Sequence, residues 1–276
     1  MFASLLVGLD GSQGADAALD AAIALGARFR STIVLAAVVD LRVMEAPLAR
    51  GAAVAWPEAV ASTPSATLEL GGVMRTRADK LLSAGAARVK AAGLEVLTSR
   101  QTGMVEDELL ELAEGAEALV VGRRGELTVP GELGDHTVRL MRRAPHPVVV
   151  AGDRASAFDR PVVAYDGSDP STAALSLAAR YAAAARVPLE VVYVSPDDGD
   201  GQALLAQAVA FLSRADVAYD THRLQGDVSR EIAAFAERAG SDVVVCGAHG
   251  RRRSWTMGST AEALVRGTSL PAIVVR

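Results

Sequence analysis

The amino-acid sequence contains an internal repeat, which constrains the fold more than any other feature of the chain. Blocks of similar residues recur in the same order in the two halves of the 276 residues. They are LLVGLDGS at 5–12 and PVVAYDGS at 161–168, ALVVGRRG at 118–125 and DVVVCGAHG at 242–250, and APHPVVV at 144–150 and LPAIVV at 270–275. Matched blocks in one order indicate a duplicated domain. We therefore predict two domains, at residues 1–152 and 160–276.

Within each half, apolar runs of strand length alternate with segments of helical periodicity. Such alternation predicts an α/β fold in which helices cover both faces of a mostly parallel, five-stranded, doubly wound sheet. We expect strands at 5–10, 32–39, 94–101, 118–121 and 147–151, and in the second half at 162–166, 189–194, 218–225, 242–246 and 272–276. We expect helices at 15–28, 72–92, 105–114 and 135–142, and then at 170–186, 202–215, 228–239 and 259–266.

Composition excludes several classes of protein. Half of the residues are hydrophobic, which is enough for a packed core, and the net charge of −5 argues against a general nucleic-acid binder. The single cysteine rules out an internal disulfide and favours a reducing compartment. The first residues lack a basic segment followed by a long apolar one, so we expect no secretory leader, and no uncharged apolar run reaches the ~18–20 residues that would span a bilayer. The sequence therefore predicts a cytoplasmic protein without a nucleic-acid or membrane partner.

A glycine loop follows a buried strand in each half and precedes a helix. Glycine lets the backbone approach a ligand closely, and a helix N-terminus offers unpaired N–H groups with a partial positive charge. We interpret both loops as anion sites, suited to the phosphates of a nucleotide. The predicted contact residues are Gly122, Gly125 and Gly134 in the first half, and Gly247, Gly250, Gly258, Ser259 and Thr260 in the second.

The two loops differ where the following helix begins. The first half has Asp135 after Gly134, whereas the second half has the neutral Ser259. A carboxylate at a helix N-terminus satisfies the donors that a phosphate would use, and it also repels the phosphate. Arg123 and Arg124 would compensate in part, and Arg251–Arg253 supply cationic donors in the second half. We therefore expect nucleotide to prefer the second half.

Asp10 and Asp166 end the first predicted strand of each half. In open α/β sheets, ligands bind beyond the carboxyl ends of the strands, where a carboxylate accepts hydrogen bonds from ribose hydroxyls or a base amine. The alternative is that each aspartate only orders the turn into the first helix. The sequence leaves both roles open.

The glycine loops and the segment 258–276 resemble the universal stress protein family, whose ATP-binding members carry Gly-x₂-Gly-x₉-Gly-[Ser/Thr] at this place. The resemblance covers nearly the whole chain, once per half. It implies tandem domains with an adenine nucleotide alpha hydrolase-like fold, packed as a pseudo-dimer through strands 147–151 and 272–276. It also implies that the protein binds ATP with Mg²⁺ as a regulatory or sensing module in a stress response. The family's base-contacting position corresponds to Val38 and Val194.

The rival hypothesis is a scaffold or interaction protein whose pockets no longer accept nucleotide. Both loops are shorter than the family's pattern, by one residue in the first half and by two in the second. Each half nevertheless has the aspartate of the family's first turn, Asp10 or Asp166. No arrangement of nucleophile and base and no Walker motif is visible, so we predict no catalytic residue and at most slow ATP hydrolysis.

Two single residues and one long segment carry further predictions. His249 has no second histidine at metal-ligand spacing, so we predict no metal site. Cys246 is interpreted as a buried residue that continues a valine run, with a redox-sensitive thiol as the alternative. Segment 41–70, which has no counterpart in the second half, is expected to be an irregular insertion that acts as a covering loop or a lid. We also expect the tandem chain to form a homodimer.

Overall fold

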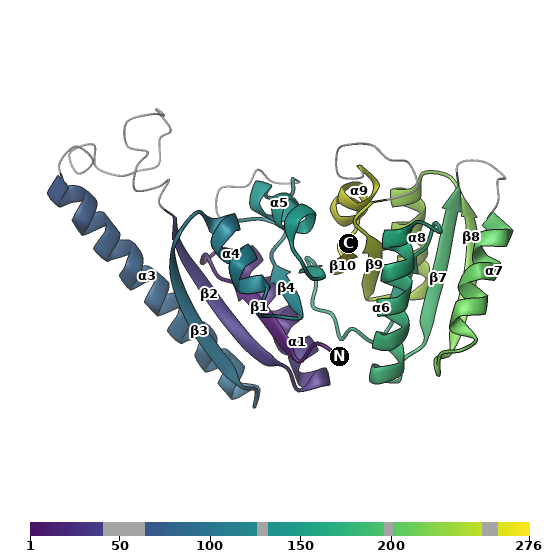
Figure 1. Ribbon diagram of the computed structural model, residues 1–276, viewed down its shortest axis with the longest axis horizontal. Coiled ribbons are helices and arrows are strands. Elements are labelled where there is room, and N and C mark those ends of the chain that lie inside the picture. Colours follow the sequence, from purple (N-terminus) through teal and green to yellow (C-terminus); the bar gives the residue numbers. More distant parts are fainter. Residues whose placement is uncertain (41–63, 126–131, 196–200, 250–258) are drawn as a thin grey trace.

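The computed structural model describes residues 1–40, 64–125, 132–195, 201–249 and 259–276, apart from the side chains of residues 64–69 and Ser259. The first half contains β1 (Ser4–Gly8), α1 (Gln13–Phe29), β2 (Thr32–Asp40), α3 (Pro64–Ala91), β3 (Val96–Gly103), α4 (Val105–Ala113), β4 (Ala118–Val121), α5 (Asp135–Arg143) and β5 (Val148–Val150) (Figure 1). The second half contains β6 (Pro161–Ala164), α6 (Asp169–Ala185), β7 (Leu189–Ser195), α7 (Gly201–Leu212), β8 (Tyr219–Gln225), α8 (Val228–Ala239), β9 (Val243–Gly247), α9 (Ser259–Gly267) and β10 (Ala272–Val275). These bounds confirm the expected elements to within a few residues, except at the start of α3.

Helix α3 begins earlier than the sequence pattern predicts. Of the segment expected to be irregular, residues 41–63 lie outside the described residues, whereas residues 64–70 are already helical. Pro64 is the first helical residue, a position where the fixed φ of proline suits the helix and its missing N–H costs nothing. The prediction of an irregular chain up to residue 70 is therefore wrong. The predicted role of segment 41–70 as a covering loop or a lid rests mainly on residues 41–63, which the structure does not describe.

The ten strands that the structure describes belong to one sheet, in the order β3-β2-β1-β4-β5-β10-β9-β6-β7-β8. Neighbouring strands within each half are parallel, whereas β5 and β10 pair antiparallel with Val149 opposite Ile273. The expected pairing of the two halves through their last strands is confirmed. The two five-stranded sheets predicted from the sequence are continuous with each other. In the described residues, no helix is both long and apolar enough to cross a membrane.

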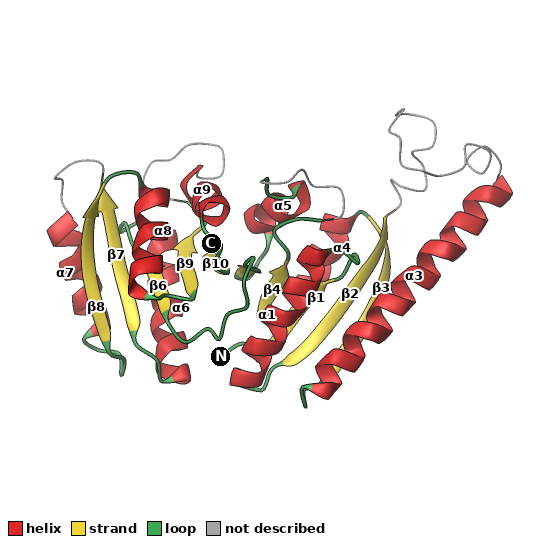
Figure 2. Ribbon diagram, turned by 180° about the vertical axis from the view of Figure 1, so that it is seen from behind, coloured by secondary structure: helices red, strands yellow, loops and turns green. Residues whose placement is uncertain are grey.

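Helices flank the sheet on both sides (Figure 2). One hydrophobic cluster gathers the buried side chains of α1, α3, α6 and α7, and a second gathers those of α4, α5, α8 and α9. Because strands covered on both faces bury every side chain, they appear in the sequence as unbroken apolar runs such as Val243–Cys246. Each cluster contains residues from both halves, so the hydrophobic core is shared between them.

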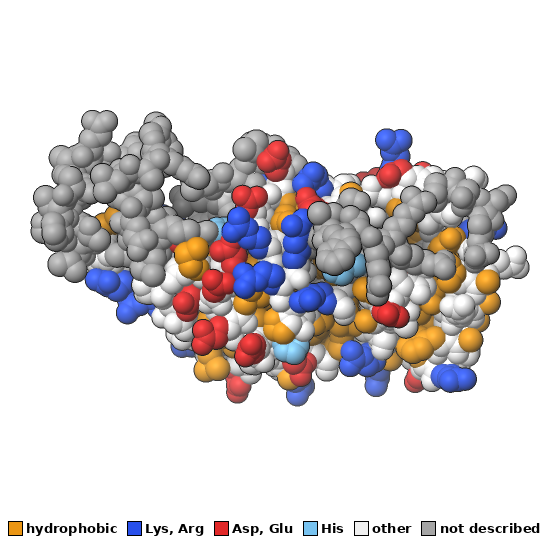
Figure 3. Space-filling model, turned by 45° about the horizontal axis from the view of Figure 1, so that its top comes forward, with side chains coloured by type: hydrophobic (Ala, Val, Ile, Leu, Met, Phe, Trp, Pro, Cys, Tyr) orange, Lys and Arg blue, Asp and Glu red, His pale blue; other side chains and the backbone are white. Residues whose placement is uncertain are grey.

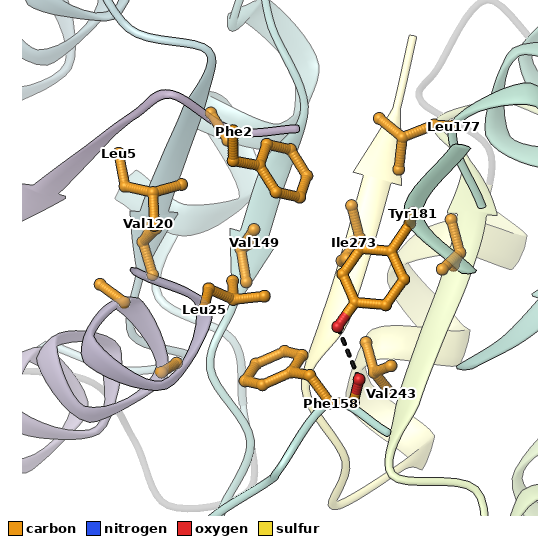
Figure 4. Close-up of a cluster of buried hydrophobic side chains, with 14 of the residues drawn as sticks. Phe2, Leu5, Leu25, Val120, Val149, Phe158, Leu177, Tyr181, Val243 and Ile273 are labelled. Carbon is orange, nitrogen blue, oxygen red and sulfur yellow. Dashed lines mark hydrogen bonds between the residues drawn. The ribbon is translucent and has the colours of Figure 1, made fainter. Parts of the chain in front are cut away.

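Aromatic side chains fill the junction between the halves. Phe29 lies edge-to-face with Phe2 at 6.0 Å between ring centroids and with Tyr181 at 5.2 Å. The Tyr181 hydroxyl donates a hydrogen bond of 2.6 Å to the carbonyl of Phe158, and burial raises the pKa of this hydroxyl. Figure 4 shows Phe2, Phe158 and Tyr181 gathered around Val149 and Ile273, which lie opposite each other on β5 and β10. Phe158 is fully buried and has a left-handed φ of 57°.

The polar stretch around residues 152–160 is fixed to both halves. Arg28 of α1 forms an ion pair with Asp159. Asp242 accepts hydrogen bonds from the backbone N–H groups of Asp159 at 2.9 Å and Arg160 at 2.8 Å. This connection therefore belongs to the folded junction, and the division into domains at 1–152 and 160–276 stays a prediction.

Candidate functional site

An aspartate turn follows the first strand of each half and has the same geometry in both. The side chain of Asp10 accepts a hydrogen bond of 2.8 Å from the backbone N–H of Ser12, and Asp166 accepts one of 3.0 Å from Ser168. The intervening glycines have φ values of 86° at Gly11 and 75° at position 167, a left-handed conformation that L side chains rarely adopt. Both aspartates therefore order the turn into the next helix, and the same position sets them at the carboxyl edge of the sheet.

The serine of each turn joins the turn to the glycine loop. As the N-cap of α1, Ser12 accepts a hydrogen bond from Ala15, and its Oγ lies 3.4 Å from the carbonyl oxygen of Arg124. In the second half, the Oγ of Ser168 lies 3.4 Å from the carbonyl oxygen of His249. The structure thus brings together the aspartate turn and the glycine loop that the sequence identified separately.

Two of the predicted glycines are required by close backbone contacts. A Cβ added to Gly122 would lie 2.4 Å from backbone atoms of Gly14, at the start of α1. A Cβ on Gly247 would lie 2.7 Å from the backbone of Pro170, at the start of α6. The first helix of each half can approach the glycine loop only because these residues have no side chain.

The other predicted contact residues surround these loops. Val38, on β2, is half-buried and Val194, on β7, is buried, each near the carboxyl end of its strand. A Cβ on Gly125 would lie 3.1 Å from the Asp10 carboxylate. Gly134 is the N-cap of α5, and Thr260 is exposed in the first turn of α9. Gly250, Gly258, residues 251–253 and the side chain of Ser259 lie outside the described part of the chain.

Arg123 does not serve a phosphate site, so that prediction is wrong. Its side chain is buried at the junction, where Nε donates a hydrogen bond of 3.0 Å to the carbonyl of Ala151. Its two terminal nitrogens donate to the carbonyls of Val265 and Leu270 in the second half. Burial lowers the pKa of this guanidinium, an effect that Asp153 opposes. The guanidinium therefore binds backbone carbonyls, two of them in the other half of the chain, and not a phosphate.

Arg124 is also engaged by a carboxylate. It forms an ion pair of 3.0 Å with Asp153, at the partly exposed rim of the junction. A solvated pair of this kind contributes little to stability and leaves the cation accessible to solvent. That Arg124 partly offsets the repulsion between Asp135 and a phosphate stays a prediction.

Sequence reasoning missed Arg77, because α3 has no closely matched counterpart in the second half. The guanidinium of Arg77 donates a hydrogen bond of 3.2 Å to the backbone carbonyl of Asp10. A Cβ on Gly11 would meet Arg77 and Leu81, whereas a Cβ at position 167 would meet Leu204. A cation and an apolar side chain therefore lie over the aspartate turn of the first half, whereas an apolar side chain alone lies that close to the turn of the second.

Helices α5 and α9 approach each other at the carboxyl edge of the two halves. A hollow of about 350 Å³ between them is lined by charged side chains of both signs, and Figure 3 shows basic and acidic groups mixed on this face. Arg142 pairs with Glu262 at 3.5 Å, and Arg139 pairs with the buried Glu106 at 2.8 Å. The described part of this hollow is therefore internally charge-paired, unlike an open anion site.

Cys246 is buried in the second hydrophobic cluster, and burial raises the pKa of its thiol to about 12. Because the thiolate is the reactive form, we expect no reaction with an aromatic disulfide reagent in the folded protein at pH 8. The same reagent should react once per chain after unfolding in guanidinium chloride, which serves as the control. Rapid reaction of the folded protein would instead support the redox-sensitive alternative.

Taken with the shared sheet, these elements define a tandem protein of the doubly wound α/β class, with matching aspartate turns in its two halves. The sequence matches the universal stress protein family over residues 1–152 and again over residues 157–276. The chain belongs to the universal stress protein family, as a tandem member.

Known relatives agree with this assignment. A universal stress protein from Synechocystis is 30% identical over 207 residues, which cover 72% of this chain and 72% of the relative. A universal stress protein from Mycolicibacterium smegmatis is 30% identical over 206 residues, or 67% of this chain and 70% of the relative. The crystal structure of a universal stress protein from Archaeoglobus fulgidus shares the fold over 99% of this chain and 96% of its own, with 20% identity and a TM-score of 0.78.

Proposed function

We propose that the protein is a cytoplasmic stress-response module that binds ATP, together with Mg²⁺, and changes its state on binding. The observation that carries this proposal is the contact between the aspartate turn and the glycine loop, 3.4 Å from Ser168 Oγ to the carbonyl oxygen of His249. It brings the Asp166 turn, proposed for the ribose, next to the start of the second glycine loop, proposed for the phosphates. ATP carries both a ribose and phosphates, so one ligand could contact both elements.

The second half is the proposed ATP site. At the start of α5 the exposed Asp135 brings a negative charge to the place where a phosphate would bind, whereas α9 starts at Ser259. Like charges ~5 Å apart cost about 3 kcal/mol at an effective dielectric constant of 20, and exposure reduces this value. A remaining difference of about 1.4 kcal/mol already corresponds to a tenfold preference for the second half.

The test is a calorimetric titration of ATP into the wild type and into Asp166→Asn and Asp10→Asn variants. Asparagine keeps the side-chain oxygen that orders the turn but removes the charge that strengthens a hydrogen bond from ribose. We expect Asp166→Asn to weaken binding about 10- to 100-fold and Asp10→Asn to leave it within twofold. Equal effects of the two variants would contradict the preference, and no heat with the wild type would contradict ATP binding itself.

Asp135→Ser gives a complementary gain of binding. Because Asp135 is exposed, the exchange should leave stability nearly unchanged. We expect a second ATP site to appear in this variant, since the variant restores the neutral residue of the family's pattern. A stoichiometry that stays at one ATP per chain would show that the shortened first loop, rather than the charge, prevents binding.

The alternative function is a scaffold whose pockets hold no nucleotide, alone or as the proposed homodimer. Asp135 favours this alternative for the first half, because its carboxylate lies at the helix N-terminus and competes with a phosphate for that position. Mass spectrometry of the small molecules released on denaturing the purified protein separates the two functions, since a sensor that binds ATP tightly retains nucleotide. Light scattering at micromolar concentration measures whether the chain is a homodimer.

A further inference from the structure

The buried side chain of Arg123 connects the first glycine loop to the second half of the chain. Its Nε donates to the carbonyl of Ala151, just after β5, and its two terminal nitrogens donate to the carbonyls of Val265 and Leu270. Val265 lies near the end of α9, and Leu270 precedes β10. One guanidinium therefore holds three carbonyl groups on both sides of the antiparallel pair that joins the halves.

The backbone of the same residue holds the start of α5. The carbonyl oxygen of Arg123 accepts a hydrogen bond of 2.8 Å from the N–H of Gly134, the N-cap of α5. The helices α5 and α9 both follow glycine loops. Through its backbone and its side chain, Arg123 therefore contacts both helices whose N-termini face the two candidate phosphate positions.

The connection in the other direction is different: the exposed Arg276, just after β10, donates a hydrogen bond of 3.2 Å to the carbonyl of Arg143 at the end of α5. In the repeat, Arg123 corresponds to Ala248, whose N–H donates 2.7 Å to the carbonyl of Val275 and whose methyl group is buried. The alanine side chain has no donor with which to reach α5. The first glycine loop is thus linked to α9, and the second loop has no equivalent link to α5 through this position.

The contact with α9 fits the polarity of that helix. The last carbonyl groups of a helix have no intrahelical donor and carry a partial negative charge, so a buried cation there satisfies a group that would otherwise remain unpaired. Because Arg123 is 6% exposed, little water is available to replace its hydrogen bonds if they break. A shift of Arg123 must therefore either carry the end of α9 with it or leave the Val265 carbonyl without this donor.

We propose that Arg123 is a positioning residue through which the first glycine loop controls nucleotide affinity in the second half. The first half, with its charged Asp135, is the regulatory half. Arg123 contacts the C-terminal end of α9, and a shift of this helix alters its N-terminus, where the phosphate of the proposed ATP site binds. This inference rests on the proposed ATP site in the second half.

The experiment compares Arg123→Met with Arg124→Met in the full chain. Methionine keeps the length and apolar stem of arginine but removes all its donors, and Arg124 is the adjacent loop arginine with only a solvated ion pair. We expect Arg123→Met to weaken ATP binding about tenfold by calorimetry, within the usual range of coupling between sites, and Arg124→Met to change it by less than twofold. Unchanged affinity in Arg123→Met would overturn the proposal.

Hydrogen exchange without nucleotide provides a separate measurement. We expect faster exchange of the amides of α9 in Arg123→Met than in the wild type or Arg124→Met, with β1 and β2 unchanged. If the wild type binds no ATP, the proposed function fails, and control of nucleotide affinity fails with it. Exchange in α9 then still decides whether Arg123 positions this helix. If Arg123→Met does not fold, Arg123→Lys replaces it; lysine keeps the charge but cannot bridge three separated carbonyls, so both effects should be intermediate.

Discussion

Replacing Phe158 with alanine is expected to lower the free energy of unfolding by about 4 kcal/mol, which makes it one of the most damaging substitutions in the chain. The Phe158 side chain is fully buried at the junction, within the cluster that contains side chains of α1 and α6. Removing the ring leaves a cavity between two halves that are held by a continuous sheet and therefore cannot close around it easily. Urea denaturation followed by circular dichroism measures the change.

Two further variants make this prediction specific. Because φ of Phe158 is 57°, a left-handed value, Phe158→Gly should be about 1 kcal/mol more stable than Phe158→Ala despite having the smaller side chain. Val73→Ala, at a position 57% exposed on α3, should change stability by less than about 0.5 kcal/mol. A loss below about 1 kcal/mol in Phe158→Ala would mean that the connection between the halves contributes little to the core.

Gly122→Ala is expected to cost about 3 kcal/mol and to separate the first glycine loop from α1. The added Cβ would lie 2.4 Å from the backbone of Gly14, and a backbone contact cannot be relieved by a change of rotamer. Either α1 or the end of β4 has to move, and the contact between Ser12 Oγ and the Arg124 carbonyl should be lost with it. The same denaturation experiment measures the loss of stability.

Gly267→Ala is the matched control, because a Cβ on Gly267, at the end of α9, meets no atom within 4 Å. Alanine is also the better helix former, so this variant should be neutral or more stable by up to about 1 kcal/mol. Similar stability of Gly122→Ala and Gly267→Ala would show that the start of α1 can move away from the loop at little cost.

The sequence predicted the order of strands and helices well because a parallel sheet covered on both faces leaves a direct record in the chain. Runs such as Val243–Cys246 admit no polar residue, and the repeat supplies each such pattern twice. The start of α3 was missed for a local reason. Prolines in segment 41–70 favour an irregular chain, yet the last of them, Pro64, begins a helix, where proline is well tolerated.

The candidate site was predicted less completely, because local sequence does not fix where a long side chain points. Arg123 lies in a glycine loop and was assigned to a phosphate, whereas two of its three carbonyl partners are 142 and 147 positions away along the chain. Those partners become neighbours only when β5 pairs with β10. One signal was present: the repeat has Ala248 where the first half has an arginine, and such a difference between otherwise matched blocks identifies a residue with its own role.

The antiparallel pair of β5 and β10 also determines what kinds of change this protein can accumulate. In a dimer of identical subunits, every substitution at the interface appears twice, related by the symmetry axis. Here the two partners are parts of one chain, so their contact does not depend on protein concentration and each side can vary alone. Only a fused pair can have Arg123 in one half where the other has Ala248, or Asp135 where the other has Ser259. Fusion removes the requirement that the two halves be identical, so each half can have a different function.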